Sequence, residues 1–178
     1  MRLLNRFKRD RRGVSAIEFA FIAPVLIVTY FSVAELCEAM LAERKVAHAA
    51  SAVGDLVAQV STIDGPGLTQ VYAAASSILA PYSTTPMQIR VTSVTTDVND
   101  NATVAWSCAD NTTALGTGAA VTLPANLLGA NQSVIMSEMV YTYNSPLNYL
   151  FKNAITFDQV FYLRPRLTST IPPPTSCS

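Results

Sequence analysis

The stretch "RRGVSAIEFAFIAPVLIVTYF", residues Arg11 to Phe31, passes from basic residues into an apolar run that contains one carboxylate, Glu18. From Val14 to Ala34 the run has 21 residues, which as a helix span about 31 Å, close to the thickness of the hydrocarbon core of a bilayer. The sequence therefore predicts a single transmembrane helix. Because an ionised side chain in a bilayer costs about 3 kcal/mol even on the mildest insertion scales, Glu18 is predicted to have a function there.

The charges are unevenly distributed, although the 12 basic and 12 acidic residues balance. Six of the basic residues precede the apolar run: Arg2, Arg6, Lys8, Arg9, Arg11 and Arg12. Basic flanks of this kind stay in the cytoplasm, so everything after Ala34 is predicted to lie outside it. A nucleic-acid-binding arm is the alternative interpretation. From Glu35 onward ten acids face six bases, which argues against a nucleic-acid partner.

A cleavable secretory signal shares the basic and apolar parts, and "SVA" at residues 32–34 offers small side chains to signal peptidase. Glu18 and Pro24 inside the apolar run argue against this interpretation, as does the helical pattern that continues past Ala34. Cleavage after Ala34, giving a secreted adhesin-like protein, remains the alternative to a membrane anchor.

The helical pattern is predicted to continue from the membrane segment through residues 35–64. Its apolar residues recur at steps of three and four: Val46, Ala50, Val53, Val57 and Val60. "DGPG" at residues 64–67 is predicted to stop this helix, because proline lacks a backbone donor and glycine favours turns. A second, shorter helix is predicted from Leu68 to Pro81.

After Pro86 the sequence changes to the two-residue alternation that is typical of half-buried strands. Two segments form a predicted hairpin and two more supply further strands: "MQIRVTSVTTDV" (87–98), "TVAWSC" (103–108), "SVIMSEMVYTY" (133–143) and "ITFDQVFYL" (155–163). The predicted fold class is α+β, in which the long helix and the short one pack on an antiparallel sheet of about four strands. The predicted parts are a leader (1–13), a transmembrane helix (14–34), its continuation (35–64), an α+β domain (68–167) and a proline-rich tail (168–178).

The three cysteines fall in two places. Cys37 follows the membrane segment, whereas Cys108 and Cys177 lie in the outer part, where an oxidising compartment would let them pair. A Cys108–Cys177 disulfide is the preferred prediction, and small buried thiols are the alternative. Since no C-x-x-C spacing occurs, a metal or redox site is not supported.

The sequence offers little support for catalysis. His48, the sole histidine, lies on the polar side of the predicted helix, and neither a G-x-S-x-G motif nor a phosphate-binding loop occurs. Asp97, Asp100 and Asp110 lie around predicted turns, where carboxylates bond to the local backbone. We expect a protein that is not an enzyme and has no cofactor and no metal site.

The segment "GVSAIEFAFIAPVL" resembles the leader region of TadE-like proteins from Tad (Flp, type IVc) pilus systems, in which a glycine is followed by a glutamate and an aromatic residue. Gly13, Glu18 and Phe19 match this motif, and Pro24 falls where the family often carries proline. Later segments are similar to the periplasmic parts of TadE-like and TadG-like sequences: "AELCEA" (34–39), "WS" (106–107), "EMVYTYNSP" (138–146) and "YLRPR" (162–166).

This resemblance implies a pilin-like minor pseudopilin or assembly component, held in the bacterial inner membrane with a periplasmic C-terminal domain, and from there incorporated into an extracellular pilus. It also implies cleavage between Gly13 and Val14 by a dedicated prepilin peptidase, and a role for Glu18 and Phe19 in assembly and subunit register. The implied partners are that peptidase, other minor pseudopilins, the Flp pilin and the Tad inner-membrane platform, acting together in tight adherence. An unprocessed single-pass scaffold for the Tad machinery is the alternative.

Overall fold

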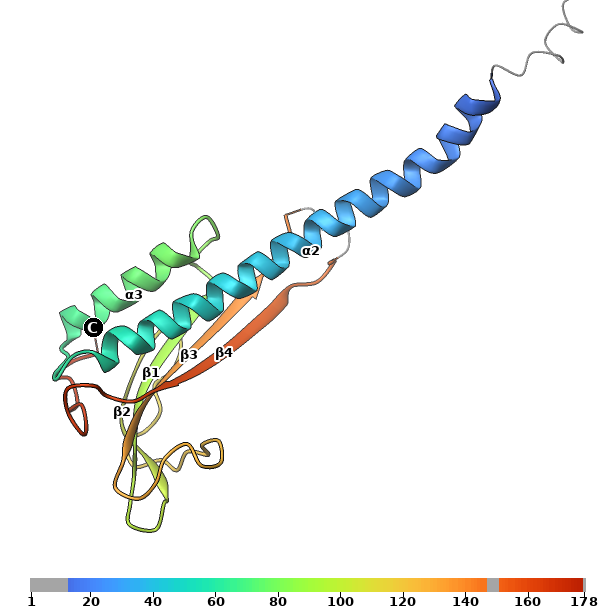
Figure 1. Ribbon diagram of the computed structural model, residues 1–178. Helices are drawn as coiled ribbons and strands as arrows, with labels where there is room; N and C mark the ends of the chain where they lie inside the picture. Colours follow the sequence, from blue (N-terminus) through green and yellow to red (C-terminus); the bar gives the residue numbers. More distant parts are fainter. Residues whose placement is uncertain (1–12, 147–150, 178) are drawn as a thin grey trace, which may run out of the picture.

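The computed structural model describes residues 13–146 and 151–177. Its elements follow in the order α2 (Val14–Ala58), α3 (Gly65–Leu79), β1 (Met87–Thr96), β2 (Ala102–Asp110), β3 (Ser133–Tyr143) and β4 (Ile155–Leu163). Figure 1 shows α2 as a long rod, whose C-terminal half lies along α3 and the sheet while its N-terminal half extends away from both. The predicted α+β class, with a long helix, a short helix and a four-stranded antiparallel sheet, is confirmed.

The four strands form one sheet in the order β2-β1-β3-β4, and every neighbouring pair is antiparallel. β1 and β2 form the predicted hairpin. At its tip the Asp97 carboxylate accepts hydrogen bonds from the backbone N–H groups of Asn99 and Asn101, at 2.7 and 2.9 Å. Hydrogen bonds from Asn101 hold the pKa of Asp97 below its usual range. This acid therefore serves turn geometry, as its position in the sequence suggested.

Small side chains let α2 lie close against β3 and β4. The buried residues of its C-terminal half recur every three or four positions: Ala39, Ala42, Val46, Ala49, Ala50, Val53, Gly54, Val57 and Ala58. The Ser137 hydroxyl on β3 donates to the Ala50 carbonyl at 2.8 Å. A Cβ atom added at Gly54 would overlap the Leu163 side chain on β4, so this glycine is required by the close approach of helix and sheet.

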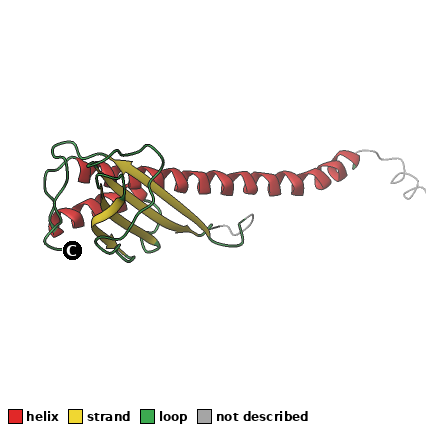
Figure 2. Ribbon diagram, turned by 90° about the horizontal axis from the view of Figure 1, so that it is seen from below, coloured by secondary structure: helices red, strands yellow, loops and turns green. Residues whose placement is uncertain are grey.

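The opposite face of the sheet is covered by the long connection between β2 and β3. Val94, Val134 and Met136 form a second, smaller core there, against which leucines and a valine of residues 115–128 pack. Segment 118–121 also bonds to the start of β2, where the Val104 N–H donates to the Ala119 carbonyl at 2.9 Å. Figure 2 shows the sheet beside one end of the long helix, while the other end of the helix extends beyond it.

The segment "DGPG" begins the second helix instead of ending the first, so this expectation was wrong. α2 already ends at Ala58, whose carbonyl accepts a hydrogen bond from the backbone N–H of Arg166 at 2.9 Å. The Asp64 carboxylate accepts from the Gly67 N–H at 2.8 Å and caps α3, with Pro66 in the first turn. Both residue types suit a helix start, because proline has no donor to lose there and aspartate satisfies an unpaired N–H group.

The proline-rich tail is held along the helix-facing side of the sheet. Ile171 is buried, and its carbonyl accepts a hydrogen bond from the Trp106 indole N–H at 2.8 Å. Cys177 and Cys108 form a disulfide, with their Cα atoms 5.2 Å apart. The tail is thus fixed by packing, by an indole hydrogen bond and by the disulfide.

Removing this disulfide is expected to lower stability substantially. The bond closes a loop with a sequence separation of 69 residues, for which chain entropy alone estimates about 4 kcal/mol. We expect Cys108→Ala with Cys177→Ala to lower the denaturant midpoint of the full-length protein in detergent, and Cys37→Ala to leave it unchanged, since Cys37 is exposed and free. Non-reducing peptide mapping checks the bond itself: alkylation of both Cys108 and Cys177 in mature protein would show that the bond is absent.

Candidate functional site

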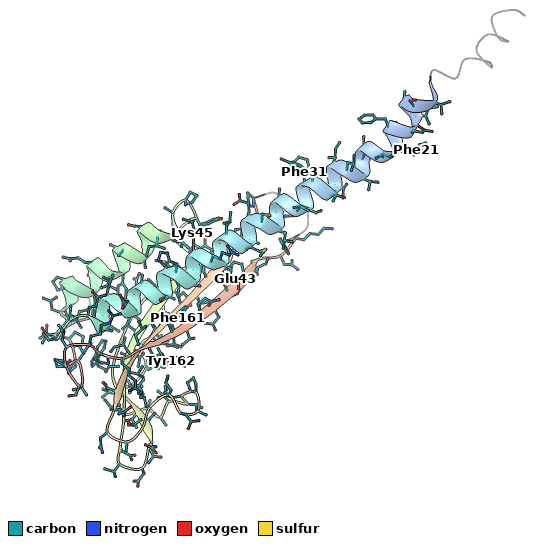
Figure 3. The ribbon with its side chains drawn as sticks, in the orientation of Figure 1. Phe21, Phe31, Glu43, Lys45, Phe161 and Tyr162 are labelled. Carbon is teal, nitrogen blue, oxygen red and sulfur yellow. A yellow bond between two sulfur atoms is a disulfide. The ribbon has the colours of Figure 1, made fainter. Side chains whose placement is uncertain are left out.

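The N-terminal part of α2, Val14–Ala34, contains no buried residue. We call this part the exposed half of α2. Figure 3 shows Phe21 and Phe31 projecting from it, beyond the reach of the sheet. Its large apolar side chains are 42–77% exposed: Val14, Ile17, Phe19, Phe21, Ile22, Val25, Leu26, Ile27, Val28, Tyr30, Phe31 and Val33. Within the described residues the chain has no core for this surface to join.

An apolar surface of this extent requires an apolar environment from outside the chain. α2 is the one helix among the described residues that is long and apolar enough to cross a membrane. Thr29 fits such an environment, because its hydroxyl donates to the Val25 carbonyl at 2.8 Å and leaves no polar hydrogen unpaired. A bilayer or a bundle of similar helices would provide an apolar environment for the exposed half of α2.

Gly13 and Val14 lie at the very start of the helix. Gly13 is the N-cap residue with a φ of −82°, a value open to any amino acid. A Cβ atom added to Gly13 would meet nothing within 4 Å. The fold therefore does not require glycine at this position. The remainder of the predicted leader lies outside the described residues.

Glu18 and Phe19 are both exposed, and Glu18 follows Val14 by about one helical turn. Among the described residues, no hydrogen bond or ion pair reaches the Glu18 carboxylate. Phe19 is 67% exposed. The structure thus places the predicted assembly residues together on the free end of α2, where they are available to another molecule.

Comparison with known protein families identifies this part of the chain. Residues 13–55 match the family model described as TadE-like protein. We call residues 13–55 the TadE-like segment. The predicted resemblance is confirmed over these residues, and nearly all of the match lies in α2, the helix that is long and apolar enough to cross a membrane. The segment "AELCEA" (34–39) lies within the match, whereas the similar segments at 106–107, 138–146 and 162–166 lie outside it. Neither the curated proteins nor the solved structures gave a match to the chain.

The TadE-like segment contains a buried carboxylate that sequence reasoning missed. Glu35 is 1% exposed and is the first buried residue of α2. The Ser145 hydroxyl, just after β3, donates a hydrogen bond to it. This contact connects the segment after β3 to α2 at the position that directly follows the exposed half. The signal was present in the spacing, because Glu35 precedes Ala39 by four residues in the same small-residue series.

Two basic residues connect the TadE-like segment to the rest of the domain. Lys45, labelled in Figure 3, donates to the carbonyls of Ile78, at 3.1 Å, and Ala80. A cation at this place satisfies the free carbonyls at the end of α3 and opposes the negative end of its dipole. Arg166 pairs with Asp55 in the last turn of α2. Both ends of the helical layer are therefore held by charged contacts.

The remaining candidate residues stay separate. His48 is exposed on α2, as expected for a solvated side chain. In the parts of the chain that the structure describes, no three His, Cys, Asp or Glu side chains gather so as to hold a metal ion.

Proposed function

We propose that this protein is a minor pseudopilin or assembly component of a Tad (Flp, type IVc) pilus, acting in pilus biogenesis and tight adherence. In this proposal it is anchored in the bacterial inner membrane with its N-terminus in the cytoplasm and its C-terminal domain in the periplasm. The observation that supports the proposal is that the two halves of α2 lie in different surroundings. Its exposed half packs on no other part of the described chain, while its second half contributes to the core of a disulfide-bonded α+β domain.

This division suits a subunit that moves from a bilayer into a filament. The exposed half can exchange lipid for neighbouring helices without disturbing the domain, because the buried contacts of α2 begin only at Glu35. The partners in this proposal are the prepilin peptidase, other minor pseudopilins, the Flp pilin and the Tad inner-membrane platform. In this proposal the peptidase cuts between Gly13 and Val14, and Glu18 and Phe19 act in assembly and subunit register.

The alternative of cleavage after Ala34 is less well supported. α2 runs without interruption from Val14 to Ala58, so residues 32–34 lie in the interior of a helix. Cleavage there would also make Glu35 the N-terminal residue, with a charged α-amino group, although its side chain is buried and bonded to Ser145. An uncut or leader-cleaved helix keeps that contact intact.

The mature protein is expected to begin at Val14. Gly13→Leu should stop processing, because a peptidase that cuts after glycine must approach the backbone closely, whereas Gly13→Ala should be partly tolerated. Since Gly13 has open space around it, neither change should affect the fold. Intact-mass measurement and N-terminal sequencing of membrane-extracted protein check this result. A chain that starts at Met1 would support the unprocessed scaffold, and one that starts at Glu35 the secreted protein.

A further inference from the structure

An open cleft of about 470 Å³ lies just after the exposed half of α2, where the helix begins to pack on the rest of the domain. It is formed by α2, the connection from α3 to β1 and the end of β3. Glu38, Tyr82, Tyr141 and Tyr143 line it, together with prolines of the two connections. Neither the predicted processing site nor the proposed assembly residues take part in this cleft.

The position of the cleft along α2 places it at the membrane surface. Glu38 follows Ala34 by four residues, which is about 6 Å along a helix. The polar layer on one side of a bilayer is about 5–8 Å thick. If Val14–Ala34 crosses the hydrocarbon core, as the proposed function requires, the cleft opens among the lipid headgroups.

The charge in the cleft is negative. Glu38 is the one charged residue among the described residues that line it, and its side chain is exposed. The nearby cation, Lys45, is engaged by the carbonyls of Ile78 and Ala80 and does not line the cleft. Burial, together with the hydrogen bond to Glu38 and its charge, raises the pKa of Tyr82 to about 12. The field of the carboxylate therefore extends over the aromatic wall.

The aromatic wall of the cleft consists of Tyr82, Tyr141 and Tyr143, and hydrogen bonds and ring contacts hold these side chains in place. The Tyr82 hydroxyl donates to the Glu38 carboxylate at 3.1 Å, and the Tyr141 hydroxyl donates to the Ser83 carbonyl at 3.0 Å. The rings of Tyr82 and Tyr143 meet edge to face, with centroids 6.0 Å apart. Tyr141 and Tyr143 are buried behind this surface, so Glu38 and the half-buried Tyr82 are the two of these residues that a ligand can reach. A carboxylate beside a tyrosine ring favours a cation with an organic attachment, because both groups attract positive charge. A phosphate alone would be repelled.

We propose that this cleft binds the ammonium group of a phosphatidylethanolamine headgroup in the outer leaflet of the membrane that α2 crosses. The inference depends on the membrane span of the proposed function, but not on leader cleavage or on pilus assembly. Bound lipid would fix the height of the domain above the bilayer, since the cleft is joined to α2, α3 and β3 together.

Native mass spectrometry of the full-length protein, released from detergent after addition of defined lipids, tests the proposal. Phosphatidylethanolamine should be retained at least about fivefold more than phosphatidylglycerol or N-acetyl-phosphatidylethanolamine, which lacks the cation. Glu38→Gln should remove this preference, and Tyr82→Leu should weaken it. Glu43→Gln is the matched control, because Glu43 is an exposed acid of α2 that does not line the cleft.

Equal retention of the three lipids by the unaltered protein would overturn the proposal, whatever the variants do. So would a preference that survives Glu38→Gln. Glu38-dependent binding of a lysine peptide without retention of phosphatidylethanolamine would assign the cleft to a protein partner and also reject the lipid. Resistance of the chain to carbonate extraction tests the membrane span separately, so that failure of the span and failure of the cleft can be told apart.

Discussion

Replacing Glu18 with glutamine is expected to leave leader cleavage largely intact while the protein fails to enter, or to support, the pilus. After cleavage Val14 would carry an α-amino group that is mostly cationic at neutral pH. In an assembly of staggered parallel helices, the Glu18 carboxylate of one subunit can meet the amine of a neighbour, so that two charges that are costly in an apolar environment neutralise each other. Glutamine keeps the shape but removes the charge, and we expect incorporation to fall at least about tenfold.

The structure supplies both the reason for this expectation and a matched control. Glu18 is exposed on the free end of α2, and no described residue of its own chain pairs with it. Thr29→Val removes another polar group from the same exposed half, but that group bonds only to its own helix, so piliation should be unchanged. Pilus counts by electron microscopy and immunoblots of sheared pili measure the effect. Normal piliation by Glu18→Gln protein at normal abundance would reject the pairing.

Replacing Gly54 with leucine is expected to destabilise the domain by about 3 kcal/mol. A Cβ atom at Gly54 would overlap the Leu163 side chain and lie 3.1 Å from the Ser137 Cβ atom, so a larger side chain has to force α2 away from the sheet. Gly54→Ala should cost much less, because the gain of about 1 kcal/mol in helix propensity offsets part of the displacement of Leu163.

Denaturant unfolding followed by the fluorescence of Trp106, the sole tryptophan and a buried one, measures these changes. His48→Leu adds the same side chain to an exposed position of the same helix and should change stability by no more than about 0.5 kcal/mol. Leu163→Ala should relieve part of the Gly54→Ala penalty, as expected for two residues in contact. Equal midpoints for Gly54→Leu and His48→Leu would contradict the close packing of α2 on β3 and β4.

The elements themselves could be predicted from the sequence, because their signals are local. The apolar run from Val14 to Ala34, and the helical spacing after it, require only neighbours within a few turns. The alternation in Met87–Thr96 likewise depends on the two faces of a single strand. The resemblance of residues 13–55 to TadE-like proteins was also carried by a short, continuous motif.

Other features depended on contacts between distant residues. The backbone N–H of Arg166, far along the chain, bonds to Ala58 at the end of α2, and "DGPG" begins α3. The same residue types suit a helix start and a helix stop, so local sequence could not separate the two. Glu35 lies in a series of small apolar residues, but its burial depends on Ser145, which is 110 positions away.

What the sequence by itself determined is therefore a membrane-length helix that continues into an α+β domain, because hydrophobic length and periodicity belong to continuous segments of chain. Only the tertiary structure decided the sheet order β2-β1-β3-β4, the need for glycine at Gly54 and the tyrosine cleft beside Glu38. These features arise where segments far apart in the chain meet, and the free energy of such contacts depends on shape and distance that no single segment contains.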